Sequence, residues 1–184
     1  MQTLIVVDAQ NEFSARGNRP TPNHAQALAA IMRRVEDARR EGRPIAWVRH
    51  HNKPGEVTPG FGPAFIPGSW GAEFSPGLGP LAGRSLEARF VKNVYGAFTG
   101  TDIGAWLDAL GSDDVLLVGF FAHMCVSTTA REALMRGLNV SIDPDGTGSM
   151  PWKHALLGEQ SAEEMRRTAL LQLNQMGVNI TPRG

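Results

Sequence analysis

The only cysteine of the chain, Cys125, lies just after an apolar segment and near the predicted start of a helix. Val115 to Val118 is predicted to form a strand, and a helix is expected from about Met124 to Arg136. A thiol at a helix N-terminus meets the positive end of the helix dipole and free backbone N–H groups, which favour the thiolate. The pattern indicates a nucleophile. The alternative is an unreactive thiol that fills the core as a small apolar side chain.

Two further reactive side chains are predicted at the same edge of a sheet as Cys125. Asp8 directly follows the apolar run Thr3 to Val7, and Lys92 directly follows the apolar pair Phe90-Val91. Ligands of open parallel sheets bind outside the carboxyl ends of the strands, so the three side chains are expected to converge there. Taken singly, such an aspartate is more often a turn residue and such a lysine a surface residue. The inference of a functional site therefore depends on all three side chains lying at one edge of the sheet.

An aspartate, a lysine and a cysteine in one site are suited to attack on a carbonyl carbon. Asp8 would take the thiol proton, or would hold a thiolate–acid pair, and Lys92 would stabilise both negative groups. Attack by Cys125 would form a thioester, with the oxyanion held by backbone N–H groups at the start of the helix. Asp8 would then protonate the leaving amine and activate a water molecule. The expected reaction is cleavage of a C–N bond in a small amide.

Apolar strands alternate with amphipathic helices along most of the chain. Helices are expected at residues 21–42, 101–111, 124–136 and 161–177, the first beginning at Thr21-Pro22 and the last at a capping box of Ser161 and Glu164. The predicted strands are 3–7, 45–48, 90–91, 115–118, 140–142 and 178–180. This alternation predicts a doubly wound α/β fold, with a parallel sheet covered by helices on both faces.

The segment from about residue 50 to residue 89 departs from this alternation. It is rich in Pro-Gly pairs, and its aromatic residues favour an ordered excursion: Phe61, Phe65, Trp70 and Phe74. A connection of this length in a compact domain is commonly functional. We expect an irregular loop that helps to wall a pocket; a loop that only covers the core is the alternative.

Composition excludes several classes of protein. The chain has 184 residues, and 18 Lys and Arg balance 18 Asp and Glu, so nucleic acid is not an expected partner. One cysteine excludes an intrachain disulfide framework and a Cys-based zinc motif. Neither a secretion signal nor an apolar run of membrane-spanning length is found. A cytoplasmic protein that acts on a small molecule, without a membrane partner, is expected.

Four segments resemble, in order, the motifs of the isochorismatase-like cysteine hydrolases. Residues 6–13 (VVDAQNEF) are similar to D-x-Q-N-D-F, and residues 67–73 (PGSWGAE) to P-G-T-x-G-x-E. Residues 92–98 (KNVYGAF) are similar to K-x-x-Y-S-A-F, and residues 119–131 end in the family's C-V-x-x-T-A-R. The resemblance implies a single domain over residues 1–184, with a three-layer α/β/α Rossmann-like fold and a six-stranded, mainly parallel sheet. It also implies a triad of Cys125, Asp8 and Lys92.

The resemblance implies further details of the site and the assembly. The peptide bond between Phe120 and Phe121 would be cis, and the N–H groups of Phe121 and Cys125 would face the oxyanion. A homo-oligomer, dimer or tetramer, is implied. Nicotinamidases of this family carry a metal-binding D-x-H motif where this chain has Arg49-His50-His51. No metal and no other cofactor is therefore expected, because the carboxylate ligand is missing. Metal binding by the His50 or His51 imidazole is the alternative.

The substrate pocket is expected to include Phe13, Trp70 and His123, with Phe121 as a further wall. His123 stands where many relatives have an aspartate, and it could equally be a turn residue. Arg49, Arg84 and Arg89 are candidates for binding a substrate carboxylate, with surface positions as the alternative. A second functional hypothesis is cofactor-free hydrolysis of isochorismate or a similar enol ether, with Asp8 as the acid. A third is a non-catalytic protein that binds a small molecule.

Overall fold

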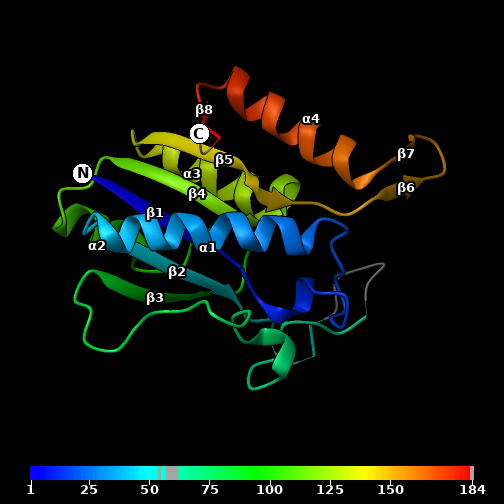
Figure 1. Ribbon diagram of the computed structural model, residues 1–184. Helices are drawn as coiled ribbons and strands as arrows, with labels where there is room; N and C mark the ends of the chain where they lie inside the picture. Colours follow the sequence, from blue (N-terminus) through cyan, green and yellow to red (C-terminus); the bar gives the residue numbers. More distant parts are fainter. Residues whose placement is uncertain (54, 57–61, 183–184) are drawn as a thin grey trace.

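The computed structural model describes residues 1–53, 55–56 and 62–182. Six strands form the central sheet in the order β3-β2-β1-β4-β5-β8 (Figure 1). They are β1 (Gln2–Val7), β2 (Ile45–His50), β3 (Glu87–Lys92), β4 (Asp114–Phe120), β5 (Asn139–Gly148) and β8 (Asn179–Ile180). All neighbouring strands are parallel, as the alternation of strands and helices predicted.

Helices cover both faces of the sheet. Helix α1 (His24–Arg40) packs on one face, where Ile31 and Val35 meet apolar residues of the central strands such as Leu4. Helices α2 (Ile103–Ala109), α3 (Ser127–Met135) and α4 (Ala162–Gln175) pack on the other face (Figure 1). Strands β1 and β4 are almost wholly buried because their apolar side chains face both layers. The three-layer α/β/α arrangement and the six-stranded sheet are confirmed.

Two element boundaries differ from the sequence prediction. Helix α1 begins at His24, with Asn23 at the N-cap position, so the predicted start at Thr21 is wrong. The Thr21 hydroxyl instead donates to the Arg19 carbonyl at 3.5 Å. The helix predicted from about Met124 begins two residues earlier, as a π-helical turn, η3 (Ala122–Val126), that leads into α3. The capping box of Ser161 and Glu164 is confirmed at the start of α4.

An antiparallel hairpin after β5 was not predicted. It consists of β6 (Trp152–His154) and β7 (Gly158–Gln160), and it projects from the body of the molecule (Figure 1). Every residue of the two strands is exposed, so the alternation of apolar and polar side chains that marks a half-buried strand is missing. None of the helices in the described part of the chain is long and apolar enough to cross a membrane.

Buried polar side chains in the loop after β1 bind the segment of residues 50–89 through hydrogen bonds. The Gln10 side chain donates to the carbonyls of His50 and Ala72, at 3.0 and 2.8 Å. The Glu12 carboxylate accepts from the backbone N–H groups of Asn18 and Phe65, each at 3.0 Å. The segment also contains a 3-10 turn, η2 (Trp70–Ala72). Phe61 lies outside the described residues.

Candidate active site

The ends of three strands bring Asp8, Lys92 and Cys125 into contact. Asp8 follows β1, Lys92 ends β3, and Cys125 lies in the turn after β4. The Lys92 ammonium is 2.7 Å from Asp8 Oδ2 and 3.3 Å from Cys125 Sγ. Strand β2 lies between β3 and β1, so the long Lys92 side chain crosses the end of β2 to reach Asp8 and Cys125. All three residues are buried, and sequence reasoning had placed them at this edge.

The backbone turns sharply at Asp8. Its φ angle is +53°, in the left-handed region that aspartate tolerates better than most residues. The Asp8 N–H donates to the Val48 carbonyl at 2.9 Å, and the Asp8 carbonyl accepts from the Gln10 N–H at 2.7 Å. These two hydrogen bonds fix the direction of the carboxylate. Neither carboxylate oxygen accepts a well-formed hydrogen bond from the described residues, and Oδ2 is in ion-pair contact with Lys92.

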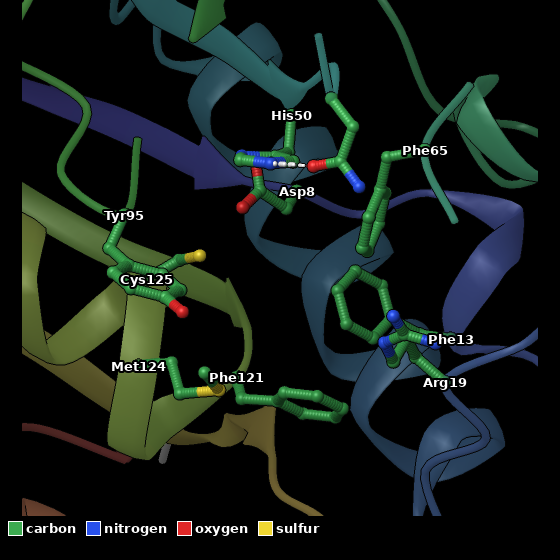
Figure 2. A pocket seen from close by; sticks show the side chains of 10 residues that line it. Asp8, Phe13, Arg19, His50, Phe65, Tyr95, Phe121, Met124 and Cys125 are labelled. Atoms are coloured by element: carbon green, nitrogen blue, oxygen red, sulfur yellow. Dashed lines mark hydrogen bonds between the residues drawn. The ribbon is translucent and has the colours of Figure 1, made fainter. Parts of the chain in front are cut away.

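Cys125 is held in the π-helical turn η3. The peptide bond between Phe120 and Phe121 is cis, as the family resemblance implied. The Phe121 carbonyl accepts from the N–H groups of Met124 and Val126, at 3.0 and 3.1 Å. These bonds fix the turn and orient the thiol towards Asp8 (Figure 2).

The electrostatics of the cluster favour a resting thiol. Burial, together with the neighbouring Asp8 carboxylate, raises the pKa of Cys125 to about 12, although Lys92 acts in the opposite direction. The thiolate expected from the helix dipole is therefore not the resting form, because loss of solvation outweighs the dipole. Burial also acts to lower the pKa of Lys92, but the Asp8 charge, with the hydrogen bonds to Asp8 and Cys125, outweighs it and raises that pKa. Lys92 is thus an ammonium ion, and the thiol needs a base.

A cavity opens beside the cluster (Figure 2). It is small and partly open to solvent. The Phe13 ring lies 5.4 Å from Phe65 and 4.8 Å from Phe121, centroid to centroid, and these rings form an aromatic wall. The cavity is lined by Asp8, Phe13, Arg19, His50, Asn52, Phe65, Tyr95, Phe121, Met124 and Cys125. Asp8 and Cys125 therefore face a small space with mostly apolar walls.

The structure brings only part of the predicted pocket to this cavity. Phe13 and Phe121 line it, whereas Trp70 and His123 do not. Trp70 is 47% exposed, and the Arg16 guanidinium lies over its ring at 4.8 Å. His123 stacks on Phe121 at 5.3 Å, and its Nδ1 is 3.0 Å from the Ser149 hydroxyl. Burial lowers the pKa of His123 to about 4, so this imidazole is neutral.

Several lining residues were missed by sequence reasoning. Arg19 lines the cavity in place of Arg49, Arg84 and Arg89, and Arg49 instead pairs with Glu73 at 3.1 Å. No periodicity marks Arg19, because it lies in an irregular loop. His50 carried a usable signal, since it comes two residues after the end of the second predicted strand. Burial and the Lys92 charge lower the pKa of His50, which keeps its imidazole neutral.

The residues at this edge do not fit a metal ion. His50 Nδ1 is 3.3 Å from the Lys92 ammonium, a cation that would repel a metal. Neither Arg49 nor His51 lines the cavity. The described residues contain no group of three or more His, Cys, Asp or Glu side chains arranged to hold a metal ion.

The fold and the site define an α/β protein with a cavity at the carboxyl edge of its parallel sheet. The chain belongs to the isochorismatase family, because the isochorismatase domain model matches residues 2–183. Members of this family are hydrolases and include amidases, so the protein is an isochorismatase-family hydrolase.

Named relatives have several activities. The chain is 34% identical to a secreted isochorismatase effector of Verticillium dahliae over 79% of this chain and 71% of that protein. It is 31% identical to a nicotinamidase/pyrazinamidase of Mycobacterium tuberculosis over 94% and 98%. Among solved structures, an isochorismatase from Pseudomonas putida has a TM-score of 0.86 at 30% identity, covering 98% of this chain and 87% of that one. An N-carbamoylsarcosine amidase from Thermoplasma acidophilum has a TM-score of 0.78 at 25% identity, covering 98% and 95%.

Proposed function

We propose that the protein hydrolyses a C–N bond of a small amide, carbamoyl or ureido compound, with Cys125 as nucleophile and a covalent thioester intermediate. The observation that carries this proposal is the contact of Lys92 with both Asp8 and Cys125, in a buried cluster that faces the cavity. Relatives named as a nicotinamidase and an N-carbamoylsarcosine amidase support the reaction class.

The first half of the reaction forms the thioester. Asp8 takes the Sγ proton, and the thiolate attacks the carbonyl carbon of the substrate. This forms the C–S bond and moves the carbonyl electron pair onto oxygen. The Lys92 ammonium stabilises the thiolate as it forms, which offsets the raised pKa of the thiol. The C–N bond then breaks, and protonated Asp8 gives its proton to the leaving nitrogen.

The developing oxyanion would be held by the backbone N–H groups of Phe121 and Cys125. Both residues belong to the turn that the Phe121 carbonyl closes through its bonds to Met124 and Val126. A fixed turn supports this role, because donors that need no reorganisation stabilise a transition state best.

The second half releases the acid. Asp8, again a carboxylate, takes a proton from a water molecule that attacks the thioester carbon. The C–S bond breaks, and the thiolate recovers a proton from Asp8. Asp8 therefore begins and ends the cycle unprotonated, and Cys125 begins and ends it as a thiol.

The walls of the cavity favour a small, flat acyl group. Phe13, Phe65 and Phe121 offer aromatic faces and edges, and such rings contribute about 0.5–1.5 kcal/mol each beyond area burial when they pair with another ring.

The test is ammonia release from nicotinamide, N-carbamoylsarcosine, ureidoacrylate, biuret and maleamate. Each compound is assayed with the wild type, Cys125→Ala and Asp8→Asn, with and without a chelator. We expect release from at least one compound, insensitive to the chelator and lost in both variants, while circular dichroism shows both variants folded. Full activity in Cys125→Ala contradicts the mechanism.

Hydrolysis of an enol ether such as isochorismate is the second candidate function. It is favoured by the resting thiol form of Cys125, which makes the cysteine dispensable for a reaction that needs only an acid. Asp8 would take a proton from a water molecule and pass it to the vinyl carbon, and the hydroxide left behind would add to the resulting oxocarbenium carbon, so that the C–O bond to the leaving alcohol breaks. Activity that survives Cys125→Ala but not Asp8→Asn selects this candidate.

We also propose that the protein is a homo-oligomer. The tip of the β6–β7 hairpin carries Leu156 and Leu157, whose exposed fractions are 89% and 86%. Adjacent exposed leucines are a typical mark of a protein interface. Light scattering should give two or four times the chain mass, and a monomer at micromolar concentration would overturn this proposal.

A further inference from the structure

His50 connects the reactive cluster to the loop that walls the cavity. It ends β2, lines the cavity, and places its Nδ1 atom 3.3 Å from the Lys92 ammonium. Its Nε2 atom is 2.7 Å from Asn52 Oδ1, the hydrogen bond drawn in Figure 2. Asn52 is buried, and its amide nitrogen donates to the Ala64 carbonyl at 2.9 Å. The Asn52 backbone N–H donates to the Phe65 carbonyl at 3.1 Å.

These partners determine the tautomer of His50. An ammonium group has donors only, so Nδ1 must be the acceptor towards Lys92. The proton of the neutral ring therefore sits on Nε2 and is donated to Asn52 Oδ1. Asn52 can present only its oxygen to His50, because its amide nitrogen is used by Ala64. The imidazole consequently has one orientation and one protonation state, and it cannot exchange protons with the substrate while these contacts last.

Lys92 has more acceptors than hydrogens. Four acceptor atoms lie within 3.3 Å of its nitrogen: Asp8 Oδ2, Cys125 Sγ, the Val94 carbonyl and His50 Nδ1. Three hydrogens cannot satisfy four acceptors fully, so the direction of the ammonium depends on which acceptors are held in place. Among these four, His50 is the one whose side chain is tied to the loop at Ala64.

We propose that His50, held by Asn52, is a positioning residue that keeps the Lys92 ammonium between Asp8 and Cys125. The proposal rests on the proposed role of Lys92 in hydrolysis. It deepens that role by making the alignment of the cluster depend on the wall of the cavity at Ala64 and Phe65. His50 acts through Lys92 and contributes an acceptor rather than a charge.

The test measures the rate at which iodoacetamide alkylates Cys125 at pH 9. This rate follows the thiolate fraction, needs no substrate, and reports one site because the chain has one cysteine. His50→Ala removes the acceptor, and His50→Asn keeps an oxygen close to the place of Nδ1. Asn52→Ala leaves the ring but releases its tether. His51→Ala is the matched control, since this neighbouring histidine does not line the cavity.

We expect alkylation to be about fivefold slower in His50→Ala, which is the factor for one lost neutral hydrogen bond, and within twofold of the wild type in His50→Asn and His51→Ala. Asn52→Ala should lie between the wild type and His50→Ala, which keeps the test valid if His50→Ala does not fold. An unchanged or faster rate in His50→Ala overturns the proposal, as does a rate in His50→Asn as slow as in His50→Ala.

Turnover separates this proposal from the proposed function. With an active substrate, His50→Ala should lower kcat and leave KM within twofold, whereas a residue that binds substrate would raise KM. Slower alkylation in a protein that hydrolyses none of the amides tested supports the positioning role and contradicts the proposed function. Alkylation of Cys125 at the wild-type rate in His50→Ala, in a protein that hydrolyses an amide, contradicts the positioning role and supports the proposed function.

Discussion

Lys92 Nζ lies 2.7 Å from Asp8 Oδ2, and the two side chains are 0% and 1% exposed. An ion pair this well shielded has lost the hydration of both groups, so each depends on the other for compensation. The pair therefore serves the fold as well as the proposed chemistry, and its removal has consequences that can be measured without a substrate.

Substitution Lys92→Met should lower the free energy of unfolding by about 3–5 kcal/mol, because it leaves the Asp8 carboxylate buried without a partner. Adding Asp8→Asn should recover a large part of that loss, since the uncompensated charge is then gone. Urea denaturation of the two single variants and the double variant measures the coupling. Lys153→Met is the control, because its ion pair with Glu159 is exposed and should not change the midpoint. Additive losses in the double variant would contradict this account.

The stability of the protein should fall at alkaline pH through Cys125. The pKa of the thiol is about 12 in the folded chain and about 8.5 in an unfolded one. The folded state therefore holds this proton more tightly, and the stability it contributes is complete below about pH 8.5 and lost as the pH rises towards 12. We expect the melting temperature of the wild type to fall faster than that of Cys125→Ala above pH 8.5. Parallel curves for the two proteins would mean that the thiol is not buried as described.

Gly119→Ala should be among the most destabilising glycine substitutions in the chain. A Cβ atom at this position would lie 1.8 Å from the Val7 carbonyl oxygen, and the φ angle is +129°. The end of β1, directly before Asp8, would have to move, so we expect a loss of about 3 kcal/mol or more and a loss of activity. Gly137→Ala is the matched control: its φ is also positive, at +80°, but nothing lies within 4 Å of the new Cβ. It should cost about 1 kcal/mol and leave activity intact. Equal losses in the two variants, measured by thermal unfolding, would rule out the steric explanation.

Phe65 and Trp70 should differ in their effect on substrate binding. Phe65 lines the cavity, and Trp70 lies outside it. For a substrate found in the amide panel, Phe65→Ala should raise KM by about tenfold, as expected for the loss of roughly 1–2 kcal/mol of apolar contact. Trp70→Ala should change KM by less than twofold. Steady-state kinetics of both variants provide the measurement. A larger rise in KM for Trp70→Ala than for Phe65→Ala would show that Trp70 contributes to substrate binding.

Much of the fold follows from sequence because strong local signals agree with it. The apolar run before Asp8 and the capping box at Ser161 each depend on residues close together in the chain, and both predictions were confirmed. The convergence of Asp8, Lys92 and Cys125 could also be predicted, since parallel strands share one carboxyl edge.

The remaining wall of the cavity could not be predicted from local patterns. The placement of Phe65 depends on Glu12, which accepts its backbone N–H from a position 53 residues earlier in the chain. Trp70 lies outside the cavity because the turn η2, capped by the Ser69 side chain, directs it towards Arg16. Such contacts join segments of irregular structure that carry no periodicity. The choice between a resting thiol and a thiolate–acid pair was left open for a related reason: the burial of Cys125 depends on packing of the whole sheet edge.

The buried ion pair has a consequence for how substrate reaches the site. Asp8 and Lys92 cancel each other's charge inside the protein, and the whole chain has a formal net charge of zero. A long-range field that could attract a charged molecule is thus small, and dissolved salt has little to screen. An uncharged amide would arrive by unbiased diffusion, and kcat/KM should stay nearly constant from low ionic strength to seawater concentration. Discrimination between substrates then depends on the shape of the cavity rather than on the rate of encounter.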